Sequence, residues 1–172
     1  TMPDTLLAAD FSSELIQNAA ELLDTLRRHQ AKLVTAESCT GGLVAALLTQ
    51  HAGSSDVTEG GLVTYSNSMK QSVLGVQAET LRQFGAVSAE TVREMAAGAL
   101  SISQDATHSV SISGIAGPGG GSSEKPVGLV WFGTAVRGGD VLAESRIFKG
   151  NRTEVRTQAA FYALALVGQR LS

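Results

Sequence analysis

Apolar residues recur at helical spacing near the start of the chain, in the segment FSSELIQNAAELLDTLRRH, residues 11–29. The repeating positions are Leu15, Ala19, Leu22, Leu23 and Leu26. Most of them lie three or four residues apart and so share one face of a helix, and Ser12 or Ser13 can cap its start. The pattern therefore predicts an amphipathic helix over residues 11–29.

Five short apolar runs further along the chain predict β-strands, at residues 31–36, 59–66, 108–116, 127–138 and 141–150. Helical spacing predicts helices at residues 42–53, 67–75, 78–85, 88–103 and 151–171. Gly138, Gly139 and Asp140 separate the last two strands, which are expected to pair antiparallel. Strands that alternate with helices and end in such a pair indicate an α/β fold, a single layered α/β/α domain with a mixed β-sheet.

The predicted domain spans residues 1–172, and the pattern contains no internal repeat and no linker. Residues 1–10 fit neither a helical nor a strand pattern, so we expect them to be flexible. The loop GPGGGSSEKP, residues 117–126, is too short to separate two domains. We therefore expect this loop to cover or line a site.

The charge balance argues against a nucleic-acid partner. The 172 residues include 13 Lys and Arg against 16 Asp and Glu, a net charge of -3, and no basic run interleaved with aromatic residues. Such a chain lacks the basic surface that contacts a phosphate backbone, so an anionic ligand should be a small molecule. A hydrophobic content of 43% with 17% charged residues is typical of a globular protein.

Cys39 is the single cysteine of the chain, which excludes an internal disulfide. With three widely spaced histidines it forms no metal-ligand cluster, and we predict neither a metal nor another cofactor. No apolar segment approaches the roughly 18 to 20 residues that span a bilayer, and the chain does not open with a signal-peptide pattern. These features favour a cytoplasmic protein without membrane contact.

The segment AESCTGG, residues 36–42, places small polar residues between a predicted strand and a predicted helix. Free amide groups and the positive end of the helix dipole meet there, and Gly41 and Gly42 let a ligand approach the backbone. One interpretation is a capped helix start, with Ser38 or Thr40 as the cap. The other is a nucleophile or an anion-binding turn.

The segment TYSNSMK, residues 64–70, places Lys70 in the first turn of a predicted helix. A cation there opposes the helix dipole, and burial would lower the pKa of its amine further. A neutral Lys70 can serve as a general base. The alternative is a lysine that extends into solvent.

Asn151 and Glu154 in the segment KGNRTEVR have the spacing of a capping box, which predicts a helix start. Arg152 and Arg156 lie four residues apart on one helical face, so their guanidinium groups can converge on a phosphate. The alternative is ion pairing with Glu154 or Glu144.

In the segment SISGIAGPGGG, residues 111–121, a predicted strand leads to Ser113, Gly114 and Gly117, whose backbone amides can face a ligand. The glycines match neither the dinucleotide-binding pattern nor the phosphate loop of ATPases. The segment therefore indicates a ligand site without naming the ligand.

Taken together, the motifs TAESCTGG, GGLVTYSNSMK, GAVS, SISGIAGPGGG, EKPVGLVWFG and RTEVR resemble the CinA C-terminal domain family, from about Leu33 to Leu166. The chain is similar to the stand-alone members, without the N-terminal domain, resembling molybdopterin-binding proteins, that many relatives carry. The resemblance implies metal-free hydrolysis of nicotinamide mononucleotide to nicotinate mononucleotide and ammonia, in NAD salvage. It also implies a homodimer.

The same resemblance implies the site residues. Ser38 matches the nucleophilic serine of the family, and Lys70, aided by Tyr65, is expected to take up the proton of its hydroxyl. The other residues are expected to bind the substrate or to stabilise an oxyanion: Glu37, Thr40, Gly41, Gly42, Ser113, Gly114, Gly117, Arg152 and Arg156.

Two alternatives stay open on the sequence alone. Cys39 lies beside Ser38 and is the better nucleophile once its thiol is ionised. The same glycines and arginines also suit a non-catalytic, nucleotide-binding regulatory module linked to competence or DNA damage. The charge balance disfavours a direct role on DNA.

Overall fold

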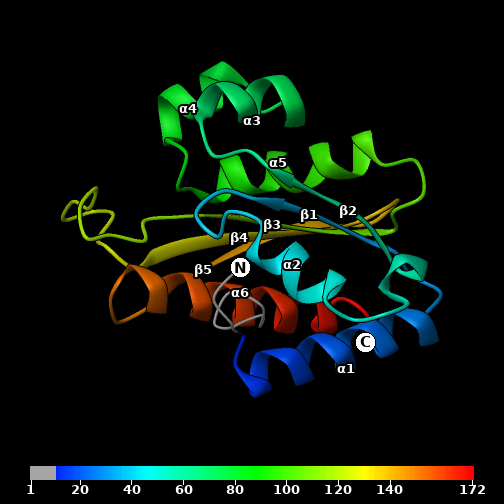
Figure 1. The fold of residues 1–172 in the computed structure, drawn as a ribbon. Coiled ribbons are helices and arrows are strands. Elements are labelled where there is room, and N and C mark those ends of the chain that lie inside the picture. The colour runs from blue at the N-terminus through cyan, green and yellow to red at the C-terminus, as the bar shows by residue number, and fades with distance from the viewer. Residues whose placement is uncertain (1–10) are drawn as a thin grey trace, which may run out of the picture.

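The computed structural model describes residues 11–172, and our expectation for residues 1–10 concerns a segment outside them. The helices are α1 (Ser13–Arg28), α2 (Leu43–Thr49), α3 (Asn67–Leu74), α4 (Ala78–Phe84), α5 (Ala89–Ile102) and α6 (Arg152–Gln169), with a 3₁₀ helix η2 (Ser54–Asp56). The strands are β1 (Leu33–Glu37), β2 (Thr58–Val63), β3 (His108–Gly114), β4 (Leu129–Val136) and β5 (Val141–Ile147). Figure 1 shows the strands in one sheet between helices.

The sheet has the strand order β2-β1-β3-β4-β5. Strand β1 pairs parallel with both β2 and β3, whereas β4 pairs antiparallel with β3 and with β5. The predicted α/β fold with a mixed sheet is therefore confirmed, as is the antiparallel pairing of the last two strands.

Helices cover both faces of the sheet. Figure 1 shows α1, α2 and α6 below the strands and α3, α4 and α5 above them. The side chains of β1 alternate between two cores. Leu33 packs into the core between the sheet and α6, while Val34 and Ala36 pack into the core between the sheet and α5. A strand buried on both faces in this way is typical of a central parallel strand.

The helix predicted at the chain start is confirmed, whereas the end of α2 differs from the prediction. Helix α1 buries all five predicted apolar positions, and Ser12 caps it by accepting a hydrogen bond from the Leu15 amide. Helix α2 ends at Thr49, because Gly53, with φ of 80°, starts the separate 3₁₀ helix η2. Within residues 11–172, no helix combines the length and the apolar character needed to cross a membrane.

The order of the strands creates a switch point at β1. The chain runs from β1 to β2 on one side of it and then returns to β3 on the other side. The connecting helices α2 and α5 consequently cover opposite faces of the sheet (Figure 1). Such a change of direction leaves a crevice at the carboxyl end of the strand, where ligands of open α/β sheets bind. The residue that follows β1 is Ser38.

Candidate active site

Ser38 is fixed by backbone hydrogen bonds on both sides of β1. Its amide donates to the Ile112 carbonyl at 3.0 Å, and the Thr64 amide donates to the Glu37 carbonyl at 2.8 Å. Continuing the parallel register one residue beyond Glu37 aligns Ser38 with Thr64 and Ser113. Because side chains alternate along a strand, Ser38 points to the same face as Ala36, the face covered by α3 and α5.

The amine of Lys70 contacts the hydroxyl of Ser38. Lys70 Nζ donates to Ser38 Oγ at 3.0 Å, to the Thr64 carbonyl at 2.9 Å and to the Tyr65 carbonyl at 3.1 Å. Ser66 caps α3 by accepting from the Met69 amide at 3.1 Å, and Lys70 lies in the first turn of this helix. The solvent-exposed alternative for Lys70 is therefore wrong, since only 1% of the residue is exposed.

Burial lowers the pKa of Lys70 from its ordinary value, because a charged amine loses its hydration there. All three acceptors are uncharged oxygens, so among residues 11–172 no carboxylate forms a hydrogen bond with the ammonium form. In the structure the Ser38 hydroxyl donates to the Tyr65 carbonyl at 3.4 Å. A neutral amine has two N–H groups, enough for the two carbonyls, so its lone pair can accept the Ser38 proton when the hydroxyl turns toward it. This geometry suits the transfer of a proton from Ser38 to Lys70.

The environment of Cys39 disfavours the reactive form of its side chain. The thiol is buried, and burial raises its pKa to about 11, so the reactive thiolate is scarce at neutral pH. Its side chain belongs to the apolar core between the sheet and α6. Of the two candidate nucleophiles, the structure favours Ser38.

Glu37 has a different role from the substrate contact that we expected. Its side chain is fully buried, and its two oxygens accept hydrogen bonds from the amides of Val44 at 3.0 Å and Ala45 at 3.1 Å. The carboxylate thus caps α2 and faces the positive end of its dipole. The predicted cap by Ser38 or Thr40 is therefore wrong, because the N-cap residue of α2 is Gly42 and the helix amides donate to Glu37 instead.

Replacing Glu37 with glutamine should lower the free energy of unfolding by about 2 kcal/mol, because the uncharged amide cannot accept from both helix amides. Urea denaturation measures this change. Glu59→Gln is the matched control, since Glu59 forms only a surface pair with Lys32 at 3.6 Å and should change stability by less than about 1 kcal/mol. Equal stability of the two variants would contradict the role of Glu37 as a cap.

The turn after Ser38 presents unused amides. The Gly41 amide donates to the Ser38 carbonyl at 3.0 Å and closes a four-residue turn. Gly41 and Gly42 have φ of 62° and 99°, a backbone region that favours glycine. Within residues 11–172, the amides of Cys39, Thr40 and Gly42 donate to no recorded backbone or side-chain oxygen. They are therefore free to bind an oxygen atom of a ligand.

The predicted capping box is present at α6, where the Glu154 amide donates to Asn151 Oδ1 at 2.9 Å. Arg152 donates to the Gly117 carbonyl at 2.7 Å and to Tyr65 Oη at 3.2 Å. Arg156 donates to the carbonyls of Cys39 and Thr40, at 3.0 and 3.3 Å.

No salt bridge to Glu154 or Glu144 is recorded for either arginine in the described part of the chain, which removes the pairing alternative. Each guanidinium also has N–H groups that donate to no other group among residues 11–172. Helix α6 therefore ties the turn after β1, the end of β2 and the glycine-rich loop together.

The residues at the end of β3 divide into two kinds. Ser113 is aligned with Ser38 and is 2% exposed. Gly114 and Gly117 serve close packing, since an added Cβ would lie 2.6 Å from a methyl of Val130 or of Val127. Contact with the substrate is not needed to explain these two glycines.

Tyr65 takes part in the site in two separate ways. Its carbonyl accepts from Lys70, whereas its phenol accepts from Arg152 and its side chain lies on the surface, with the residue 63% exposed. The recorded contacts thus connect its backbone, rather than its phenol, to the Ser38–Lys70 pair. The predicted aid of Tyr65 to Lys70 therefore has a contact in the structure through the Tyr65 carbonyl.

Thr64 was missed by the sequence analysis. Its carbonyl holds Lys70, and its buried hydroxyl has no hydrogen-bond partner among the described residues. Along β2 the structure alternates half-buried and exposed residues, and the continuation of this alternation turns Thr64 inward and Tyr65 outward. The sequence TEGGLV has no matching alternation of polar and apolar residues, so no sequence pattern marked Thr64.

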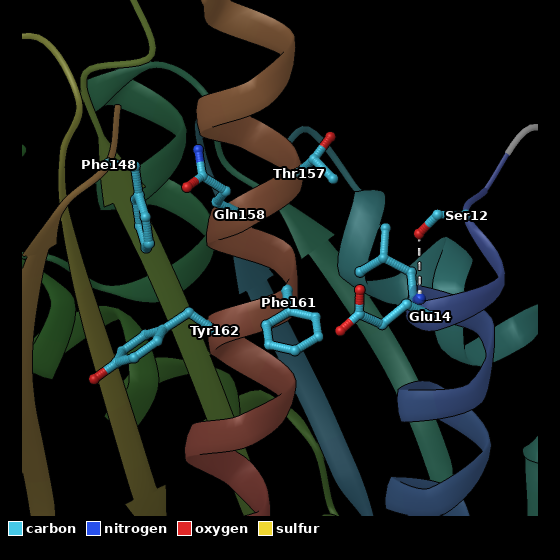
Figure 2. Close-up of a pocket in the computed structure, with 8 residues that line it drawn as sticks. Ser12, Glu14, Phe148, Thr157, Gln158, Phe161 and Tyr162 are labelled. Carbon is cyan, nitrogen blue, oxygen red and sulfur yellow. Dashed lines mark hydrogen bonds between the residues drawn. The ribbon is translucent and has the colours of Figure 1, made fainter. Parts of the chain in front are cut away.

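A separate pocket of about 330 Å³ lies between α1 and α6, with aromatic rings on one side and the start of α1 on the other (Figure 2). Its lining residues are Ser12, Glu14, Leu15, Phe148, Thr157, Gln158, Phe161 and Tyr162. This lining has no basic side chain, so it suits a phosphate less well than the surroundings of Ser38. Among residues 11–172, no group of three His, Cys, Asp or Glu residues could hold a metal ion.

Known proteins share both the sequence and the fold. The sequence model of the CinA C-terminal domain family matches residues 16–171. The nicotinamide-nucleotide amidohydrolase PncC of Escherichia coli K12 is 51% identical over 158 residues, which cover 92% of this chain and 95% of that protein. The crystal structure of the competence/damage inducible protein CihA from Agrobacterium tumefaciens superposes with a TM-score of 0.89 at 45% identity, covering 95% of this chain and 99% of that one.

A second crystal structure agrees with the first. It is that of the competence damage-inducible protein A (ComA) from Klebsiella pneumoniae, with a TM-score of 0.87 at 38% identity. The match covers 91% of this chain and 96% of that chain. The chain therefore belongs to the CinA C-terminal domain family.

Proposed function

We propose that the chain is an amidase that hydrolyses nicotinamide mononucleotide to nicotinate mononucleotide and ammonia, with Ser38 as the nucleophile. The observation that carries this proposal is the 3.0 Å contact between Lys70 Nζ and Ser38 Oγ in a buried site. The names of the similar amidohydrolases support the choice of a nicotinamide nucleotide as substrate.

In the first half of the reaction, Ser38 Oγ attacks the carboxamide carbon while its proton moves to Lys70 Nζ. The carbonyl oxygen becomes an oxyanion, which the free amides of the turn stabilise. The intermediate collapses, the C–N bond breaks, and Lys70 gives its proton to the leaving nitrogen. Ammonia departs and the acyl group stays on Ser38 as an ester.

In the second half, water attacks the ester carbon and gives a proton to Lys70. The second intermediate collapses, and the proton returns from Lys70 to Ser38 Oγ. Nicotinate mononucleotide leaves and the neutral amine is restored. The carbonyls of Thr64 and Tyr65 keep the amine oriented in every step, because they accept its other N–H groups.

Arg152 is proposed to bind the phosphate. It lies exposed at the start of α6 and donates to the Gly117 carbonyl and the Tyr65 phenol, and its guanidinium has further N–H groups for a ligand. Ser113 lies beside Ser38 on the adjacent strand, where it can contact the same ligand.

Arg152→Ala should raise KM for nicotinamide mononucleotide roughly 10- to 100-fold while kcat changes little, because a charge-assisted hydrogen bond is lost. Steady-state ammonia release measures both constants. Nicotinamide riboside, which has no phosphate, should react equally well with the variant and the wild type. A loss of the same size on the riboside would contradict the assignment of Arg152 to the phosphate.

The proposed activity is tested by incubating the purified chain with nicotinamide mononucleotide and identifying the products by chromatography and mass. Equal amounts of nicotinate mononucleotide and ammonia are expected. Tight binding of the nucleotide by calorimetry, with no product after long incubation, would instead indicate the non-catalytic regulatory module.

The proposal includes the setting predicted from the sequence: a cytoplasmic homodimer that acts in NAD salvage. Val63, Tyr65 and Met69 are large hydrophobic residues that stay exposed on β2, α3 and the connection between them. This surface would be available to a second subunit. Sedimentation at twice the chain mass of 17.8 kDa would support the homodimer.

A further inference from the structure

We propose that Arg156 is a positioning residue, which holds the turn after Ser38 so that the Thr40 amide binds the oxyanion. This inference rests on the proposed amidase function. It replaces the phosphate contact that the sequence suggested for Arg156. The reasons lie in the geometry of the turn and in the side from which Arg156 approaches it.

The turn brings one free amide close to the nucleophile. Residues Ser38 to Gly41 form a four-residue turn closed by the hydrogen bond from the Gly41 amide to the Ser38 carbonyl. In turns of this kind, the amide two positions after the first residue lies within reach of the first side chain. Here that amide belongs to Thr40, and it has no recorded acceptor among the described residues.

Arg156 determines the direction of this amide. A trans peptide group is planar, so its carbonyl and its N–H point in opposite directions. The Cys39 carbonyl, which shares a peptide group with the Thr40 amide, accepts from Arg156 Nε at 3.0 Å. The Thr40 carbonyl accepts from the same guanidinium at 3.3 Å. The Thr40 N–H consequently points away from Arg156.

The two sides of the turn belong to different layers. Arg156 comes from α6, below the sheet in Figure 1, whereas Lys70 comes from α3, above it. An amide that points away from α6 points toward the layer that holds Lys70 and the Ser38 side chain. The charge of Arg156 also polarises the peptide group that it binds, which makes the Thr40 N–H a stronger donor.

The neighbouring Arg152 has no such role. Its recorded acceptors are the Gly117 carbonyl and the Tyr65 phenol, neither of which belongs to the turn after Ser38. The two arginines therefore predict different kinetic effects: Arg152 acts on substrate binding, and Arg156 acts on the chemical step.

The test compares Arg156→Ala and Arg156→Lys with Arg170→Ala. Arg170 is the matched control, because this C-cap residue of α6 also donates to backbone carbonyls, those of Thr134 and Asp140, far from the turn after Ser38 in the sequence. We expect Arg156→Ala to lower kcat about 100-fold with KM within about threefold. Arg156→Lys should recover part of kcat, and Arg170→Ala should keep both constants near those of the wild type.

A second readout does not depend on turnover. The amide resonance of Thr40 in a ¹⁵N–¹H correlation spectrum should shift in Arg156→Ala and stay in place in Arg170→Ala. If Arg156→Ala raises KM and leaves kcat unchanged, Arg156 binds substrate and the inference is overturned. If the wild type releases no ammonia, the proposed function fails, and an unshifted Thr40 resonance then overturns the positioning role separately.

Discussion

Replacing Ser38 with alanine is expected to lower kcat for ammonia release from nicotinamide mononucleotide by at least about 10⁴-fold, because the acyl ester can no longer form. The fold should be retained, since the backbone contacts of Ser38 to Ile112 and Gly41 do not involve its side chain. Stopped assays of ammonia over hours measure a loss of this size.

Cys39→Ala is the matched control for Ser38→Ala. It removes the neighbouring nucleophilic side chain, whose burial raises the pKa of the thiol to about 11. We expect this variant to keep kcat within a fewfold of the wild type, with a modest loss of stability from the small cavity it leaves. The reverse result, with activity lost in Cys39→Ala and kept in Ser38→Ala, would make Cys39 the nucleophile.

Lys70→Met should lower kcat by about 10³-fold, within the range that a general base contributes. Methionine is unbranched and apolar, so it can fill the space of the buried lysine stem. A cooperative unfolding transition by circular dichroism would show that lost activity does not reflect an unfolded protein. Retention of wild-type kcat would remove Lys70 from the mechanism.

The same lysine predicts two effects of pH. Activity should rise with pH as Lys70 loses its proton, with a midpoint below the ordinary 10.5, because burial lowers its pKa. Between the pKa of the folded state and that of the unfolded chain, the unfolded chain binds more protons, so stability also rises with pH there. Denaturant titrations of Lys70→Met should not show this rise in stability.

Sequence patterns predicted the fold because they follow local rules. The helix buried through Leu15 to Leu26, the capping box of Asn151 and Glu154, and the antiparallel pair around Gly138 all depend on neighbours close in sequence. The positions of Lys70 and the arginines were anticipated from residue type and helix position. Their hydrogen-bond partners were not anticipated, because most of these acceptors are backbone carbonyls, which every residue carries and no sequence pattern distinguishes.

The predictions failed where contacts between residues distant in sequence determine the role of a side chain. Glu37 caps α2 through amides seven and eight residues later, outside the spacing of any capping box. Tyr65 turns outward because β2 alternates half-buried and exposed positions up to its end, and its phenol accepts a hydrogen bond from Arg152 of α6. Such contacts appear only once the sheet has brought three chain segments to one edge.

The central claim is that Ser38 carries the acyl group during hydrolysis of nicotinamide mononucleotide. The most direct measurement is to quench the reaction in acid within the first turnover and to digest the protein. Tandem mass spectrometry of the peptide that contains both Ser38 and Cys39 then gives its mass and the modified residue. The account predicts the acyl group of nicotinate mononucleotide as an ester on Ser38. The acyl group on Cys39, or a peptide of unchanged mass while ammonia is released, would contradict it.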